Sequence, residues 1–76
     1  FDADEILVPP ESDWVGQSLT ELNFRHRYGV TVIGIRRGGR PNASPRAADT
    51  IQGGDALIVV GTQQGIADVR AALPAV

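Results

Sequence analysis

The chain of 76 residues contains no cysteine, no lysine and no methionine, and its single histidine is His26. Without cysteine it can form neither a disulfide framework nor a thiolate metal site, which favours a reducing, cytosolic setting. The acidic residues lie mostly in predicted loops, with no histidine spacing that would hold a metal and no EF-hand pattern. A nucleophile paired with a base is missing as well. We therefore expect no catalytic residue, no metal ligand and no enzymatic activity.

Long apolar runs are missing too. No stretch approaches the roughly 20 apolar residues that a membrane span requires, and no basic-then-apolar leader opens the chain. Because methionine is absent, we expect residues 1–76 to be a single domain excised from a longer polypeptide. Folding at this length buries only about 60% of the surface that the unfolded chain exposes. Support from a partner surface, such as a second copy, is therefore expected.

All positive charge comes from arginine, and it is unevenly placed although the net charge is only −2. The first 21 residues carry acids and no base, whereas residues 22–46 carry six arginines and no acid: Arg25, Arg27, Arg36, Arg37, Arg40 and Arg46. The planar fork of arginine suits phosphate or carboxylate. Two interpretations stay open: an anion site, or a charge match between the first third and the middle of the chain. The acidic total and the few aromatic residues argue against a nucleic-acid partner.

Local signals predict the first elements. Residues 3–8 read as a strand that ends at two prolines. Residues 18–21 (SLTE) form a capping-box pattern, which predicts a helix from residue 19 to about residue 28. Gly29 supplies the left-handed residue that commonly ends helices. Trp14, in the preceding loop, is interpreted as a lid over the core edge or as an anchor for a partner.

Residues 30–36 predict a strand that is apolar on both faces. Such a strand needs cover on two sides, and a chain this short covers the second side most easily by dimerisation or docking. A glycine in mid-strand often marks a bulge or the close approach of another backbone. We expect a dimer interface formed by Val30, Val32, Gly34 and Ile35.

The second half predicts a turn at Gly38-Gly39 and a polar crossing over residues 40–48 with at most a short edge strand. Residues 49–60 read as a hairpin whose second strand, 56–60, is continuously apolar and should be central. A last helix follows the cap residue Thr62 and ends at Pro74. The sequence thus predicts an α+β fold, two helices packed on a small, mostly antiparallel β-sheet in the order β-α-β-β-β-α.

Several segments, taken together, are similar to the RCK_C (TrkA-C) domain, the C-terminal regulatory subdomain of RCK-type K⁺ channels and cation/proton antiporters. They are ILVPP at 6–10, VGQSL at 15–19, RHRYGV at 25–30, IGIRRGG at 33–39 and GDALIVVG at 54–61. The resemblance implies a regulatory domain that forms homodimers and acts on a membrane transporter or channel from the cytoplasmic side. Some members bind cyclic di-AMP in a cleft across the dimer axis.

The resemblance also implies site residues. Arg25 would approach a phosphate of the nucleotide and Thr31 would supply a polar contact, while apolar or edge contacts would come from Leu19, Phe24, Ile33 and Pro45. Each has a structural alternative, since the apolar residues also suit a core and an arginine suits the negative end of a helix. Competing functions are a structural dimerisation module without a ligand and the effector domain of a transcription regulator.

Overall fold

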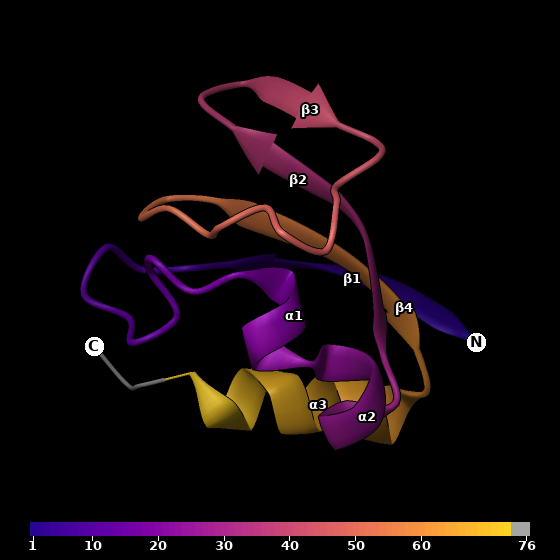
Figure 1. The fold of residues 1–76 in the computed structure, drawn as a ribbon. Coiled ribbons are helices and arrows are strands. Elements are labelled where there is room, and N and C mark those ends of the chain that lie inside the picture. The colour runs from indigo at the N-terminus through magenta and orange to yellow at the C-terminus, as the bar shows by residue number, and fades with distance from the viewer. Residues whose placement is uncertain (74–76) are drawn as a thin grey trace.

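A computed structural model of the protein describes residues 1–73, in which three helices lie on one face of a four-stranded antiparallel sheet (Figure 1). The strand order is β1-β4-β2-β3. The predicted α+β class is confirmed. The elements are β1 (Asp2–Leu7), α1 (Leu19–Leu22), α2 (Phe24–Tyr28), β2 (Thr31–Arg37), β3 (Arg40–Asn42), β4 (Ala56–Gly61) and α3 (Gln63–Ala72).

Strand β4 is central, as its continuous apolar run predicts. It pairs with β1 on one side and with β2 on the other. Leu57 and Val59 on β4 are fully buried and belong to the hydrophobic core. The core also contains Ile6, Val8, Trp14, Leu22, Phe24, Val30, Ile35, Ile51, Ile66 and Val69. Trp14 therefore belongs to the core, and its ring stands edge-on to Phe24 with centroids 5.1 Å apart.

The predicted helix over residues 19–28 is divided into two short helices. Its start is as expected, because the Ser18 hydroxyl accepts from the Glu21 amide and the Glu21 carboxylate accepts from the Ser18 amide. Asn23 has left-handed backbone angles (φ 49°, ψ 53°), which Asn tolerates better than most residues, and it separates α1 from α2. Gly29, at φ 70°, ends α2 as predicted.

A bulge at residue 33 changes the expected faces of β2. The register against β4 shifts between Val32 and Gly34, which confirms the bulge that the mid-strand glycine suggested. Val30 is 0% and Ile35 is 3% exposed, so both side chains fill the core of this chain. Their side chains are therefore occupied within this chain, and the dimer interface itself stays a prediction. Gly34 is covered by Ile58 and the Asn42 carbonyl, which leaves only Val32 of that set partly exposed.

The predicted hairpin over residues 49–60 is also wrong. Ile51 pairs with the loop before α1 instead of with β4: its amide donates to the Gln17 carbonyl at 2.9 Å and its carbonyl accepts from Gly16 at 2.8 Å. This distant partner satisfies the backbone that a hairpin would otherwise have paired. The edge strand β3 and the glycine turn before it are as predicted, with Gly38 and Gly39 both at positive φ.

Helix α3 follows its predicted cap, since the Thr62 hydroxyl accepts from the Gly65 amide at 3.0 Å. Ile66 and Val69 are buried against the sheet, and Leu73 packs on the edge of the core. The predicted stop at Pro74 lies outside the described residues. Within residues 1–73 no helix is both long enough and apolar enough to cross a membrane.

Leu57→Ala should lower the free energy of unfolding by about 2–5 kcal/mol, because it opens a cavity beneath the central strand. Leu7→Ala is the matched control, since Leu7 is 64% exposed on β1 and its truncation should change stability by less than about 0.5 kcal/mol. Urea unfolding followed by circular dichroism measures both. Equal losses in the two variants would contradict the central position of β4.

Candidate functional site

The first amides of α1 hold the polar crossing against the helix. The amide of Leu19 donates to the Asp49 carbonyl at 3.1 Å, and the amide and hydroxyl of Thr20 both donate to the Ala47 carbonyl at 2.9 Å. Amides in the first turn of a helix have no partner within that helix. Residues 46–50 supply those partners here, and the segment is thereby fixed between α1 and β2.

A cavity of about 210 Å³ lies between this segment, the α1–α2 junction and the start of β2; we call it the Arg25 cavity. Six of its eight lining residues are apolar and one is charged, but polar atoms make up the larger part of the surface that faces the cavity. The lining residues are Leu19, Asn23, Phe24, Arg25, Val30, Val32, Pro45 and Ala47. An apolar hollow with a few placed polar groups is the usual form of a small-molecule site.

The structure brings together four of the six predicted ligand residues in the walls of the Arg25 cavity: Leu19, Phe24, Arg25 and Pro45. Thr31 and Ile33 are not among the lining residues. Strand side chains alternate between faces, so Thr31 points away from the side that Val30 and Val32 share, and Ile33 lies at the bulge with 46% of its surface exposed.

Four lining residues were not expected there: Val30 and Val32, which were predicted for a dimer interface, and Asn23 and Ala47, which were predicted for no site. Asn23 enters the wall because its left-handed backbone breaks the helix, and Ala47 enters through its long-range bond to Thr20. The tolerance of Asn for left-handed geometry is a signal that could have indicated Asn23. Nothing local in the sequence indicates Ala47.

Arg25 is the charged group of the Arg25 cavity. It lies with His26 and Arg27 in the last turn of α2, as predicted, where cations complement the negative end of the helix. Within residues 1–73 its side chain makes no ion pair, whereas Arg36, Arg37 and Arg70 pair with Glu5, Asp55 and Asp4. Only the Arg36–Glu5 pair joins the acidic first third to the arginines of the middle, so the charge match is met in small part. Within residues 1–73, Arg25 shares the lack of an ion pair with Arg27, Arg40 and Arg46, and it is the one of these four that lines the Arg25 cavity.

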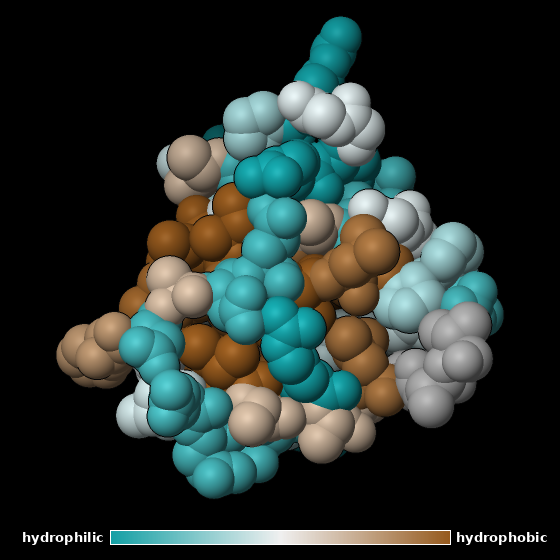
Figure 2. All heavy atoms as spheres, turned by 180° about the vertical axis from the view of Figure 1, so that it is seen from behind, coloured by the Kyte–Doolittle hydropathy of each residue, from teal (hydrophilic) through white to brown (hydrophobic). Residues whose placement is uncertain are grey.

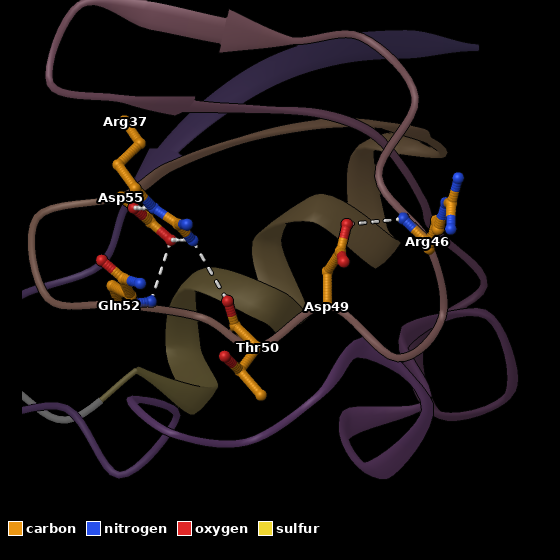
Figure 3. A network of polar contacts seen from close by, with 6 residues as sticks. All are labelled: Arg37, Arg46, Asp49, Thr50, Gln52 and Asp55. Carbon is orange, nitrogen blue, oxygen red and sulfur yellow. Dashed lines mark hydrogen bonds and ion pairs between the residues drawn. The ribbon is translucent and has the colours of Figure 1, made fainter.

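A second cavity of about 260 Å³ lies on the far side of the same segment, beneath the β2–β3 hairpin; we call it the hairpin cavity. It is lined by Ile35, Arg37, Arg40, Asn42, Asp49 and Thr50. Arg37 forms one wall and is held in place by Asp55: Nε donates to Oδ1 at 2.8 Å and Nη2 to Oδ2 at 2.7 Å. Nη2 also donates to the Thr50 carbonyl at 3.1 Å, and Figure 3 shows this network.

The Arg37–Asp55 pair shifts the pKa values of both groups. Hydrogen bonds from Arg37 lower the pKa of Asp55, and they outweigh its burial, which acts in the opposite direction; the Gln52 amide lowers it further. The same hydrogen bonds raise the pKa of Arg37. The Asp55 side chain is 1% exposed and the Arg37 side chain 44% exposed, so the carboxylate depends on its partner more than the guanidinium does.

The solved structures contain a counterpart of this domain. The RCK_C domain dimer of S. agalactiae BusR in complex with c-di-AMP matches the chain with a TM-score of 0.84 and 31% sequence identity, over 92% of this chain and 86% of that one. The fold is therefore that of an RCK_C domain. The family model of the TrkA-C domain matches residues 5–73, and the chain belongs to this family. The resemblance expected from the sequence is confirmed.

Relatives by sequence are transport proteins. The chain is 40% identical over 57 residues to "Uncharacterized transporter YfbS" of Escherichia coli (strain K12), a match that covers 75% of this chain and 9% of that protein. It is 36% identical over 57 residues to Ktr system potassium uptake protein C of Bacillus subtilis (strain 168), over 75% of this chain and 26% of that protein. The matched region is thus a small part of each relative.

Asp55→Asn should lower the free energy of unfolding by about 1.5–3 kcal/mol at neutral pH, because it removes the acceptor charge that Arg37 binds. Since the pKa of Asp55 is depressed in the folded state, its contribution is complete above the ordinary value of about 3.9 and is lost as the pH falls through the folded value. Unfolding by urea between about pH 7 and pH 2 should show a shallower acid loss in the variant than in the wild type.

Asp4→Asn is the control for this prediction. Asp4 also has a lowered pKa, through its hydrogen bond from Arg70, but both side chains of that pair are about half exposed and solvent screens them. Its removal should change stability little at any pH. An Asp55→Asn variant as stable as Asp4→Asn would show that the Arg37–Asp55 pair does not contribute to the stability of the fold.

Proposed function

We propose that the domain is the ligand-sensing part of a K⁺ or other cation transporter or antiporter, that it binds cyclic di-AMP in the Arg25 cavity, and that it catalyses no reaction. The observation that carries this proposal is the position of Arg25, whose guanidinium makes no ion pair within residues 1–73 and lies in the wall of a hollow with apolar side chains around it. The S. agalactiae BusR structure, whose RCK_C domain is a dimer in complex with c-di-AMP, supports it.

The size of the cavity supports a site shared between two copies. At about 210 Å³ it falls below the usual range of roughly 300–1,000 Å³ for pockets that enclose a drug-sized ligand. A cyclic dinucleotide has two equal halves, and a two-fold dimer presents the same surface twice. The ligand would lie on the dimer axis with one half in each cavity. This arrangement agrees with the small volume of each cavity and with the symmetry of the ligand.

The roles of the lining residues follow from their chemistry. Arg25 donates charge-assisted hydrogen bonds to a phosphate, while Leu19 and Pro45 give an adenine an apolar surface. Phe24 is only 4% exposed, so it supports this surface from the core. Thr31 and Ile33 lie outside the Arg25 cavity, so they reach only those parts of the ligand that project from it.

The surface also suits a second copy. Large hydrophobic side chains are exposed on the sheet, Leu7 at 64% and Ile33 at 46%. Figure 2 shows hydrophobic residues on both sides of a band of hydrophilic residues on the face turned away from the viewer in Figure 1. Exposed apolar patches rimmed by polar groups are typical of interaction surfaces. The homodimer, at the cytosolic face of the membrane, would pass the ligand signal to the transporter.

Arg25→Ala should weaken cyclic di-AMP binding by about tenfold to a hundredfold, because one charge-assisted contact to a phosphate is lost. Arg27→Ala is the matched control: it removes the same charge from the same turn of α2, but Arg27 does not line the cavity. Isothermal titration calorimetry of the purified chain gives the dissociation constants. Equal losses of affinity in both variants would mean that the nucleotide responds only to the positive charge of α2. This result would contradict a specific phosphate contact at Arg25.

The alternatives predict other results. A chain that sediments as a dimer but releases no heat with cyclic di-AMP is a structural dimerisation module. A chain that stays monomeric at high concentration contradicts both that module and the shared site. A parent protein that carries a DNA-binding segment before this domain would make it the effector domain of a transcription regulator, and the sequence upstream of residue 1 in the parent decides this.

A further inference from the structure

The hairpin cavity has a distribution of charge that the proposed function does not use. Arg37 and Asp55 neutralise each other, since the carboxylate accepts two hydrogen bonds from the guanidinium. The other charged groups in the lining are Arg40 and Asp49, one of each sign. Within residues 1–73 neither of them forms an ion pair, either with the other or elsewhere. The lining of the hairpin cavity thus contains one positive and one negative side chain that are not paired within residues 1–73.

The two charged side chains, Arg40 and Asp49, come from different parts of the chain. Arg40 and Asn42 come from β3 above the cavity, and Asp49 comes from the segment that α1 holds in place. One carboxylate oxygen of Asp49 accepts from the Arg46 amide at 2.8 Å, which fixes the direction of the side chain and leaves the other oxygen free. Figure 3 shows Arg37 descending from β2 and Asp49 rising from the segment below, apart from each other.

The remaining walls are small and mixed in polarity. Ile35, which is 3% exposed, gives an apolar surface, and the Thr50 side chain offers a hydroxyl. The Asn42 Oδ1 accepts from the Ser44 amide at 3.1 Å and keeps one further acceptor position. A volume of about 260 Å³ accepts only a compact molecule. Asp49 would repel a lone anion, and Arg40 would repel a lone cation. A ligand with a single charge is therefore favoured by only one of these two side chains.

We propose that the hairpin cavity binds a small zwitterion of the free amino-acid class. The carboxylate of the ligand lies on Arg40, its ammonium group on Asp49 and Asn42, and its side chain against Ile35. This site is separate from the Arg25 cavity and does not require cyclic di-AMP. Both cavities share β2 and the segment that α1 holds, so the two sites are neighbours on one support.

The test is a titration of the ¹⁵N-labelled chain with L-alanine, L-valine and L-glutamine, followed by two-dimensional NMR. Saturable shifts of the Asn42 and Thr50 amides, with smaller shifts at Val32, are the expected result. Acetate and methylammonium, which carry one charge each, should bind at least about tenfold more weakly than the amino acids, because each engages only one of the two charged side chains.

Substitutions locate the site. Asp49→Asn keeps the acceptor for the Arg46 amide and removes the charge, and Arg40→Gln removes the opposite charge; each should weaken L-alanine binding at least about tenfold. Arg46→Gln is the matched control, since Arg46 belongs to the same segment, does not line the hairpin cavity and bonds Asp49 through its backbone. It should bind L-alanine as the wild type does.

Three results would overturn the proposal. The first is the absence of a saturable shift with any of the amino acids up to about 10 mM, ten times a millimolar dissociation constant. The second is acetate binding as tightly as L-alanine, which would make this a plain anion site. The third is a shift of the Asn42 and Thr50 amides on dilution without ligand, which would show a second copy in the cavity. Cyclic di-AMP binding is measured separately, so its failure does not affect this test.

Discussion

The first-turn amides of α1 determine where both cavities lie. They have no partner in their own helix, and the carbonyls of Ala47 and Asp49 supply one. Residues 43–48 form no helix or strand. The hydrogen bonds from α1 therefore fix the position of this segment, which forms a wall between the two cavities. On one side of it Pro45 and Ala47 close the Arg25 cavity, and on the other side Asp49 and Thr50 line the hairpin cavity.

The two cavities differ in electrostatics although they share β2. The Arg25 cavity has mainly apolar lining residues and one positive charge, which suits a phosphate joined to an aromatic base. The hairpin cavity is polar and neutral in total, because the buried carboxylate of Asp55 cancels Arg37. The bulge at Ile33 separates the part of β2 that lines the first from the part that lines the second. One strand therefore contributes to two sites of different chemistry.

Signals that act within a few residues were predicted correctly, because their hydrogen bonds are local: the capping box at Ser18, the helix end at Gly29 and the cap at Thr62. Contacts between residues distant in sequence were not predicted correctly. Ile51 was assigned to a hairpin but pairs with the loop near Gln17, and no local pattern distinguishes these outcomes. In the site the same limit holds: Leu19, Phe24, Arg25 and Pro45 were predicted through the resemblance, whereas Ala47 depends on a contact to Thr20. Thr31 and Ile33 do not line the Arg25 cavity, because the alternation and the bulge of β2 direct them away from it.

The central claim is that the Arg25 cavity holds one half of a nucleotide shared by two copies of this chain. A crystal structure of the chain with cyclic di-AMP tests it most directly. The account predicts the ligand on a two-fold axis, with a phosphate within hydrogen-bonding distance of the Arg25 guanidinium and an adenine against Leu19 and Pro45 in each copy. A ligand bound elsewhere, or a dimer whose own side chains fill the Arg25 cavity, would contradict it.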